Sequence, residues 1–547
     1  MHIQSLRPAS ASLTPSPVAV AAPPTPADPA DHMTFTVPGP TLSNDPMAGT
    51  QETPQPAVPI RREAAQGAPL AQLEEAPPVA LKSRTALQIL RESAVVASGA
   101  AFHREEAYAV MDRFAAAQDP VTCLLPLHVR TQDGQLVPTD HLASGLDFGR
   151  HTAGLVMTAQ VAAAQGDLTR AARYLQAAET NYARGKKLLA EGDVFMHRRD
   201  FNEDGSVKST HVGEPGKSAD GADDMTRVNP RAYAFRAAAE LYQATGNPDY
   251  KEDFARYFGA WVKDFHDPVQ GGFFVHANIH SEGDHTERGS FKNPGGTDST
   301  YSGSEGVKGN DSTIYALSSV LLAANEVLAT PQTRALVQES MDIILDKFVR
   351  RNGMLWENYT ADFQPISQDW QNQPRENGSS SHVAIGGHTA MAAQQIIEGA
   401  RQLKKQGAIS DSKYQSYIDR TVGLFQDFAS HSGALDWNTG AVHNAIRVEE
   451  PDQDKRWMQP WGDASWQQAE LLQTLLRLRE EDRLHEIQGP DGRNGSDLLA
   501  LAEQHYASHY ALPAEYSFTD YFGNPDVYHR PQVAQYFQQA LSQKEGQ

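Results

Sequence analysis

The chain has 547 residues, of which 40% are hydrophobic, and a formal net charge of −21 at neutral pH. Its length allows two or more domains, or one large repetitive domain with a tail. The acidic balance argues against nucleic acid and anionic membranes as partners, because their phosphate groups would repel the chain. No apolar run approaches the roughly 18 residues of a membrane-spanning helix, so the sequence predicts no membrane segment.

Residues 1–80 differ in composition from the remainder of the chain. They hold 16 of the 33 prolines and a single aromatic residue, Phe35. Such a segment cannot bury enough apolar surface to offset the entropy lost on folding. The sequence therefore predicts a disordered leader over residues 1–80 and a folded domain over residues 81–547.

The leader also bears on location. It lacks the basic start and the apolar block of a conventional secretory signal, so we expect a cytoplasmic protein. Its richness in Ser, Ala and Pro also resembles the export leaders of bacterial effector proteins, which leaves secretion by a non-classical signal as the alternative.

The chain has one cysteine, Cys123, in the segment VTCLLPL. A single cysteine cannot form an internal disulfide, so the fold does not depend on an oxidising compartment. Its apolar neighbours predict a small, buried side chain rather than a reactive thiol.

Helix starts are marked three times by the same device, a capping residue followed by proline. The pairs are Asn229–Pro230, Asn247–Pro248 and Thr330–Pro331. The capping side chain accepts a hydrogen bond from a free N–H group of the first turn, where proline needs no N–H of its own. Gly246 and Gly353 are predicted to end the first and third of these helices.

Apolar side chains then recur at helical spacing, which predicts one buried face per helix. The stripes are Phe254, Tyr257, Phe258, Trp261 and Phe265 in one helix, and Val337, Met341, Ile344 and Phe348 in another. We predict an all-α domain of about twelve or thirteen helices with few, short strands. A closed α/α barrel and an open α-solenoid fit this pattern equally well, since both stack helical hairpins.

Two connections are unusually long for a compact domain, over residues 192–226 and 276–309. Long connections of this kind often form functional lids or rims. The second contains His276, His280, Asp284 and His285, but its glycine-rich flanks argue against the helix that a metal site with this spacing needs. We therefore predict no metal site there.

Five segments of the sequence resemble those of a known family. They are RAYAFRAAAELYQATGNPDY with FHDPVQGGFF, NGMLWENYTADFQP, GGHTAMAAQQI, QPWGDASWQQAELLQTLLRL and VYHRPQVAQYF. Together, over roughly Gly134 to Leu541, they resemble the N-acylglucosamine 2-epimerase superfamily, which includes mannose isomerases and cellobiose 2-epimerases. The resemblance implies an (α/α)6 barrel whose active site lies where the inner helices begin.

The resemblance also implies a chemistry. Epimerising a sugar at C2 removes the proton beside the open-chain carbonyl and returns one to the other face, which requires two acid/base groups. Histidine titrates in the required range without large tuning. The two histidines that the family uses match His388, which follows a glycine pair at a predicted helix start, and His529. This chemistry requires no metal and no other cofactor.

Five further positions are implied as substrate-binding residues. Arg150 matches an arginine near the sugar oxygen, where a cation would stabilise the negative charge of an enediolate. The other four are candidates for walls and for hydroxyl contacts: Tyr233, Glu357, Trp466 and Glu470. The expected partner is therefore a small sugar; the sequence leaves the oligomeric state open, and a homodimer is compatible with it.

Three positions depart from the family pattern. Met391 stands where the family usually has a glutamate, and Ser312 and Ile314 replace two histidines. Two other functions stay open, and the departures at Met391 and Ser312 favour the second of them. One is a glycoside hydrolase or lyase that pairs Glu357 with Asp298 or Asp311. The other is a non-catalytic, effector-like binding protein.

Overall fold

The computed structural model describes residues 86–126, 128–132, 135–213, 225–278, 285, 287–292, 298–303, 306–349, 353–355, 358–364, 383–443, 445–447, 465–510 and 528–542. The predicted leader, residues 1–80, lies outside the described residues. No described helix is long and apolar enough to cross a membrane.

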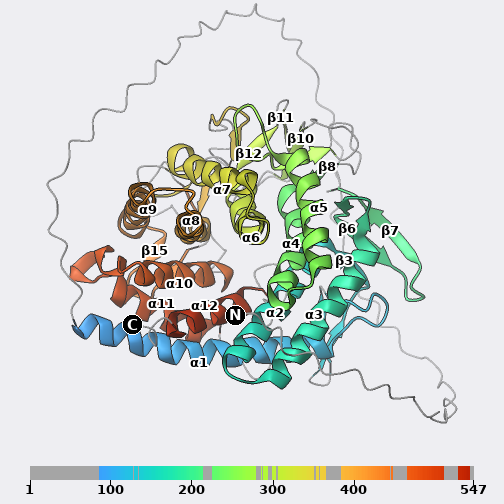
Figure 1. Ribbon diagram of the computed structural model, residues 1–547, viewed down its shortest axis with the longest axis horizontal. Helices are drawn as coiled ribbons and strands as arrows, with labels where there is room; N and C mark the ends of the chain where they lie inside the picture. The colour runs from blue at the N-terminus through green and yellow to red at the C-terminus, as the bar shows by residue number, and fades with distance from the viewer. Residues whose placement is uncertain are drawn as a thin grey trace, which may run out of the picture. The chain divides into compact units, whose positions relative to one another are not determined.

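Twelve α-helices of the described chain form two concentric rings (Figure 1). The inner ring consists of α2 (Gly145–Ala164), α4 (Val228–Thr245), α6 (Leu322–Val327), α8 (Gly386–Lys405), α10 (Ser465–Glu480) and α12 (His529–Ser542). The outer ring consists of α1 (Ala86–Ala116), α3 (Leu168–Leu189), α5 (Pro248–Phe265), α7 (Pro331–Ile343), α9 (Asp411–His431) and α11 (Gly495–His509). The predicted all-α fold of helical hairpins is confirmed.

The ring is closed rather than open. Each inner helix packs against the next, and the last, α12, packs against the first, α2, while α1 covers α12 and α11. An open solenoid would leave its first and last repeats apart. Of the two architectures that the helix pattern allowed, the chain therefore adopts the (α/α)6 barrel.

Short helical segments of other types extend two of these helices. The π-helical turns η1 (Asn310–Ile314) and η2 (Leu317–Leu321) lead into α6, so the third inner helix is longer than α6 alone. A third π-helical turn, η3 (Ile344–Phe348), continues α7. The 3-10 turns η4 (Leu484–Glu486) and η5 (Pro490–Gly492) lie between α10 and α11.

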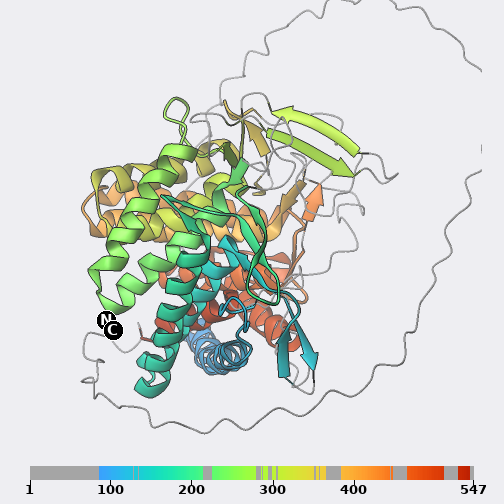
Figure 2. The ribbon, with the colours of Figure 1, turned by 90° about the vertical axis from the view of Figure 1, so that its right-hand side faces the viewer.

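A three-residue strand runs directly into each of four inner helices. These strands are β3 (Leu142–Ser144), β8 (Met225–Arg227), β12 (Val307–Gly309) and β14 (Val383–Ile385). Each pairs antiparallel with a strand that follows the next outer helix: β6 (Arg198–Phe201), β9 (His276–Asn278), β13 (Asn358–Thr360) and β17 (Ala445–Arg447). The repeat unit is thus strand, inner helix, outer helix, strand, and most strands gather at one end of the barrel (Figure 2).

The remaining strands form short hairpins or add to these pairs. They are β1 (Val129–Gln132) with β2 (Gln135–Pro138), β4 (Ala190–Glu191) with β5 (Val194–Phe195), β7 (Val207–His211) beside β6, β10 (Glu287–Lys292) with β11 (Asp298–Gly303), and β15 (Leu435–Asp436) with β16 (Ala441–Val442). The last two residues of the segment GGFFVHA, His276 and Ala277, begin β9.

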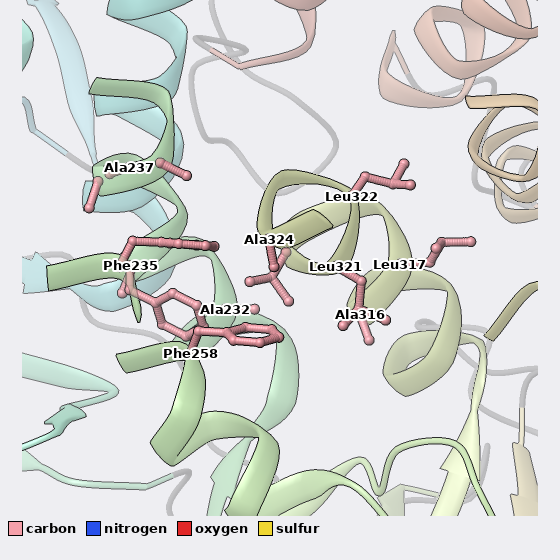
Figure 3. Packing of buried hydrophobic residues seen from close by; sticks show 14 of the residues in the cluster. Ala232, Phe235, Ala237, Phe258, Ala316, Leu317, Leu321, Leu322 and Ala324 are labelled. Atoms are coloured by element: carbon pink, nitrogen blue, oxygen red, sulfur yellow. The ribbon is translucent and has the colours of Figure 1, made fainter. Parts of the chain in front are cut away.

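The hydrophobic core fills the space between the two rings. Inner helices are surrounded on all sides, so α4 is lined with alanines that let neighbouring helices approach, and aromatic side chains of α5 pack against it. Figure 3 shows part of this cluster, with Phe235 of α4 and Phe258 of α5 on the side that faces Ala324 and Leu321 of the third inner helix. The predicted stripe of α5 is buried throughout.

Two of the three predicted helix starts are confirmed. Asn247 accepts a hydrogen bond from the Asp249 amide, and Thr330 accepts one from Thr333, so α5 and α7 begin at the following prolines. The prediction that Asn229 caps a helix is wrong. Because β8 runs straight into α4, the helix begins two residues earlier, and Arg227 occupies the capping position without a side-chain hydrogen bond.

The helix ends also differ in part. Gly246 ends α4 in a left-handed conformation, as predicted. Gly353 has a positive φ of 72° but lies beyond the helix, which already ends at Phe348. Cys123 is exposed rather than buried, because it occupies a tight turn with a φ of 56° that places the neighbouring Leu124 and Leu125 in the core.

Candidate functional site

Six side chains, one from each inner helix, lie within the first two turns of those helices, at the end of the barrel where the strands gather. We call them the six-residue ring: Arg150 of α2, Tyr233 of α4, Tyr315 of the third inner helix, His388 of α8, Trp466 of α10 and His529 of α12. Sequence distances of up to 379 positions separate them. Closure of the barrel therefore brings them together.

Trp466 packs near both histidines. Its ring centre is 5.5 Å from that of His388 and 6.4 Å from that of His529. Both histidines are buried, with exposed fractions of 4% and 7%. The Tyr315 hydroxyl lies 3.2 Å from Nε2 of the His388 imidazole.

Tyr528 connects the remaining members of the ring. Its ring centre lies 5.1 Å from that of His529 and 5.5 Å from that of Tyr233, edge to face in both cases. Cζ of Arg150 lies 4.6 Å from the ring centre of Tyr233 and 5.6 Å from that of Tyr528. The contacts therefore run without a break from Tyr315 through both histidines to Arg150.

Arg150 keeps its charge in this setting. Burial acts to lower the pKa of its guanidinium, but the nearby Tyr233, Tyr315 and Asp147 outweigh that effect and raise the pKa. Its Nε atom is buried and makes no hydrogen bond within the described residues. The six-residue ring therefore includes a permanent cation with an unused donor.

Arg236 holds Tyr528 in place. Its guanidinium donates hydrogen bonds to the Tyr528 hydroxyl at 2.7 Å, to the Ser318 carbonyl at 3.0 Å and to Glu240 at 3.0 Å. Burial raises the pKa of Tyr528 well above its ordinary value, so this phenol stays neutral. Tyr528 thus gives His529 a rigid aromatic neighbour.

Glu470 brings a carboxyl group to the two histidines from α10. It is only 3% exposed, and the Gln394 amide of α8 donates a hydrogen bond to its Oε2. Burial raises the pKa of Glu470 to about 7, against the opposing influence of His529, the Gln394 hydrogen bond, His388 and Arg150. A group with this pKa changes its protonation state near neutral pH, in electrostatic reach of both imidazoles.

The glycine pair before His388 is explained by close packing. A Cβ on Gly387 would stand 2.6 Å from Cγ of Gln467 and 2.7 Å from the Trp466 ring, and one on Gly386 would meet Val442 at 2.6 Å. The Gly387 amide also donates a 3.1 Å hydrogen bond to the Gln467 side chain. Ile385, at the capping position, has no polar side-chain atom that could accept a hydrogen bond from the first turn. The glycines therefore allow α8 to begin against α10, which sets His388 beside Trp466.

Comparison with solved structures identifies the fold. The chain matches the cellobiose 2-epimerase from Spirochaeta thermophila DSM 6192 with a TM-score of 0.56 and 16% identity, over 81% of this chain and 97% of that one. It matches the cellobiose 2-epimerase from Bacillus thermoamylovorans B4167 with a TM-score of 0.56 and 13% identity, over 80% and 98% of the two chains. A D-mannose isomerase matches with a TM-score of 0.54 and 14% identity, over 79% and 96%.

The chain has the fold of the sugar 2-epimerases. The fold that the sequence resemblance implied is thereby confirmed. No family model and no curated protein matches the chain by sequence.

Within this epimerase fold, the positions that depart from the family pattern serve packing. Met391 and Ile314 are buried in the hydrophobic core. Ser312 is buried. Its hydroxyl accepts a 2.9 Å hydrogen bond from the Gly309 amide and donates a 3.0 Å hydrogen bond to the Gly309 carbonyl, which anchors the start of the third inner helix. None of the three is a member of the six-residue ring.

Some predicted residues fall outside what the structure describes. Glu357 lies outside the described residues. Asp298 begins β11 and Asp311 lies in η1, but their side chains are outside the described set, so the carboxylate pair of a hydrolase stays a prediction. His280 and Asp284 also lie outside it. His276 is on strand β9, and the described residues contain no group of three or more His, Cys, Asp or Glu side chains with metal-binding geometry.

Sequence reasoning missed three residues of the site. Tyr528 directly precedes His529, and Tyr315 directly follows Ile314, so each stands beside a position already noted. Gln394 lies six positions after His388 on the same helix. The sequence signal was present as proximity to a motif, but the contacts join different helices and depend on the closed barrel.

Proposed function

We propose that the protein is a carbohydrate 2-epimerase or aldose–ketose isomerase, in which His388 and His529 move the proton at C2 of an open-chain sugar. The observation that carries this proposal is the placement of two buried histidines, from α8 and α12, against the same tryptophan. The shared fold of the cellobiose 2-epimerases and the D-mannose isomerase supports it.

The chemistry needs two bases for a simple reason. One neutral imidazole removes the proton from C2, and the electron pair of that bond moves to the carbonyl oxygen to give an enediolate. The second group, as an imidazolium, then returns a proton to the opposite face of C2. Return to C1 instead converts the aldose into a ketose. Two histidines on different helices suit this task, because each can face one side of a planar intermediate.

The rest of the ring supplies binding and charge stabilisation. The Arg150 guanidinium is a preorganised cation that can stabilise the enediolate oxygen as its charge develops. Trp466 and Tyr233 offer apolar faces of the kind that pack against the C–H groups of a sugar. Glu470, with a pKa of about 7, stabilises whichever histidine is protonated.

Proton exchange in deuterated water tests this proposal. The protein is incubated with a panel of aldoses, ketoses and β-1,4-linked disaccharides, and deuterium at C2 is followed by NMR. The proposal expects deuterium incorporation by the wild type from both C2 epimers and, in His388→Asn, its loss from the epimer whose C2 proton His388 removes. His505→Asn on the outer helix α11 is the control, since His505 is also buried but lies outside the ring.

Three outcomes would contradict the proposal. Exchange that persists undiminished on both C2 epimers in His388→Asn would remove this residue from the reaction. Release of a reducing sugar from glycosides without C2 labelling would favour the hydrolase alternative. Sugar binding without labelling or hydrolysis across the panel would favour a non-catalytic binding protein.

A further inference from the structure

We infer that Tyr315 is the positioning residue for His388: its phenol fixes the proton of the imidazole on Nδ1 and keeps the lone pair on Nε2. The inference rests on the proposed function only in giving His388 a role as a base, whose Nε2 takes the C2 proton once the bound sugar has displaced the Tyr315 hydroxyl from its lone pair. The inference goes beyond the proposed function by assigning a role to a residue that no sequence motif marked. The contact is direct, with 3.2 Å between the hydroxyl and Nε2.

Ring packing fixes the same pair. The rings of Tyr315 and His388 lie edge to face, with centres 5.4 Å apart and an interplanar angle of 86°. Trp466 packs against His388 at 5.5 Å. The imidazole thus contacts both Tyr315 and Trp466, and a turn about its Cβ–Cγ bond would break the hydrogen bond to Tyr315.

The local backbone places Tyr315 for this purpose. The π-helical turns η1 and η2 lie on either side of it, so this stretch departs from α-helical spacing just where the hydroxyl reaches α8. Ser319 and Ser318 donate hydrogen bonds to the Tyr315 carbonyl, the second at 3.4 Å. Such π turns inside helices are often found at functional sites.

The hydrogen bond has a chemical consequence. In neutral imidazole one nitrogen carries the proton and the other accepts, and the partner of each nitrogen decides which is which. A neutral phenol is a good donor, so it favours the form in which Nε2 accepts. Met391, one turn after His388, cannot compete for this role, because a thioether has no N–H or O–H to donate.

Nitrogen NMR tests the inference without any substrate. Protein labelled with 15N-histidine is measured at pH 8, and the His388 signals are assigned from their loss in His388→Gln. The wild type should show an unprotonated Nε2, and in Tyr315→Phe the two nitrogens should move toward the averaged shifts of mixed tautomers. A protonated Nε2 in the wild type, or an unchanged His388 spectrum in Tyr315→Phe, would overturn the inference.

Kinetics provides the second measurement on a sugar that the wild type exchanges. Tyr315→Phe should lower kcat for C2 exchange by about 10- to 100-fold with KM within about threefold, the range expected when a group that orients a catalytic residue is removed. Tyr417→Phe is the matched control. It removes a tyrosine hydroxyl on the outer helix α9 that donates a 2.8 Å hydrogen bond to Asp342. Equal kcat in Tyr315→Phe and wild type would overturn the inference.

The two tests separate two kinds of failure. If the wild type exchanges no sugar, the proposed function fails, and the NMR result still decides whether Tyr315 sets the tautomer. If exchange occurs but the tautomer does not respond to Tyr315→Phe, the function stands and the positioning role falls.

Discussion

Gln394 of α8 donates a hydrogen bond to Oε2 of Glu470 on α10. The carboxyl that influences both histidines is therefore held from the helix that carries His388. This contact joins two neighbouring inner helices inside the barrel, where the carboxyl is 3% exposed. The protonation of Glu470 is consequently tied to the stability of the fold as well as to the site.

Glu470→Gln should change how stability depends on pH. The pKa of Glu470 rises from 4.5 to about 7 on folding, so the folded state holds this proton more tightly than the unfolded state. The stability this gives is full below about pH 4.5 and is lost as pH rises through about 7. The total is roughly 3 kcal/mol. Urea unfolding at pH 5 and pH 8 should show the wild type losing most of this stability relative to Glu470→Gln, whereas parallel pH profiles would refute the prediction.

Glu339→Gln is a control with the opposite sign. Burial acts to raise the pKa of Glu339, but hydrogen bonds from His266 at 2.9 Å and the Gly272 amide at 2.8 Å lower it overall. A lowered carboxyl pKa gives stability that is present above the ordinary value and lost as pH falls. Glu339→Gln should therefore be less stable than wild type at pH 7, with the gap closing on acidification.

Gly387→Ala should separate α8 from α10. The new methyl group would stand 2.6 Å from Gln467 and 2.7 Å from Trp466, so the helix start or the tryptophan has to move. Overpacking of this kind costs about 1–3 kcal/mol and should also impair turnover, because Trp466 contacts both histidines. Thermal unfolding and C2 exchange measure the two effects.

Gly423→Ala is the matched control for that substitution. Gly423 lies inside α9, and nothing stands within 4 Å of the position of its added Cβ. Replacing an unhindered helical glycine by alanine should stabilise the protein by roughly 0.5–1 kcal/mol. If Gly387→Ala and Gly423→Ala behave alike, close packing is not the reason for the glycine pair.

Tyr528→Phe should weaken the support of His529. It removes the acceptor of a 2.7 Å hydrogen bond from Arg236 while keeping the ring. The loss of one partner of a charged, partly buried donor costs about 1–3 kcal/mol. We expect lower stability and a reduced exchange rate, whereas Tyr182→Phe on α3 should reduce stability alone. A Tyr528→Phe protein with wild-type exchange would show that His529 needs no such support.

The outer helices were readable from the sequence because their signals are local. The Asn247–Pro248 start and the stripe from Phe254 to Phe265 depend on residues within one helix, and the structure confirms both. Asn229 carried the same signal and failed, since pairing of β8 with β9 decides where α4 begins. That pairing joins residues about fifty positions apart, beyond the reach of a local pattern.

The site shows the same division. His388 and His529 were candidates through a resemblance in short motifs, and the structure brings both to one tryptophan. No pattern in the sequence marked Tyr315. The π-helical turns on either side of it depart from the regular α-helical spacing on which such a pattern would rest. Its importance comes from a contact with α8, 73 positions away in the chain.

The most direct test of the central claim compares deuterium exchange by His388→Asn and His529→Asn on both C2 epimers of a sugar that the wild type interconverts. Each variant keeps one of the two bases, so neither should epimerise. Each should still exchange the C2 proton of one epimer, and the two variants should act on opposite epimers. If both variants retain epimerisation, or both exchange the same epimer, the two-histidine account is wrong.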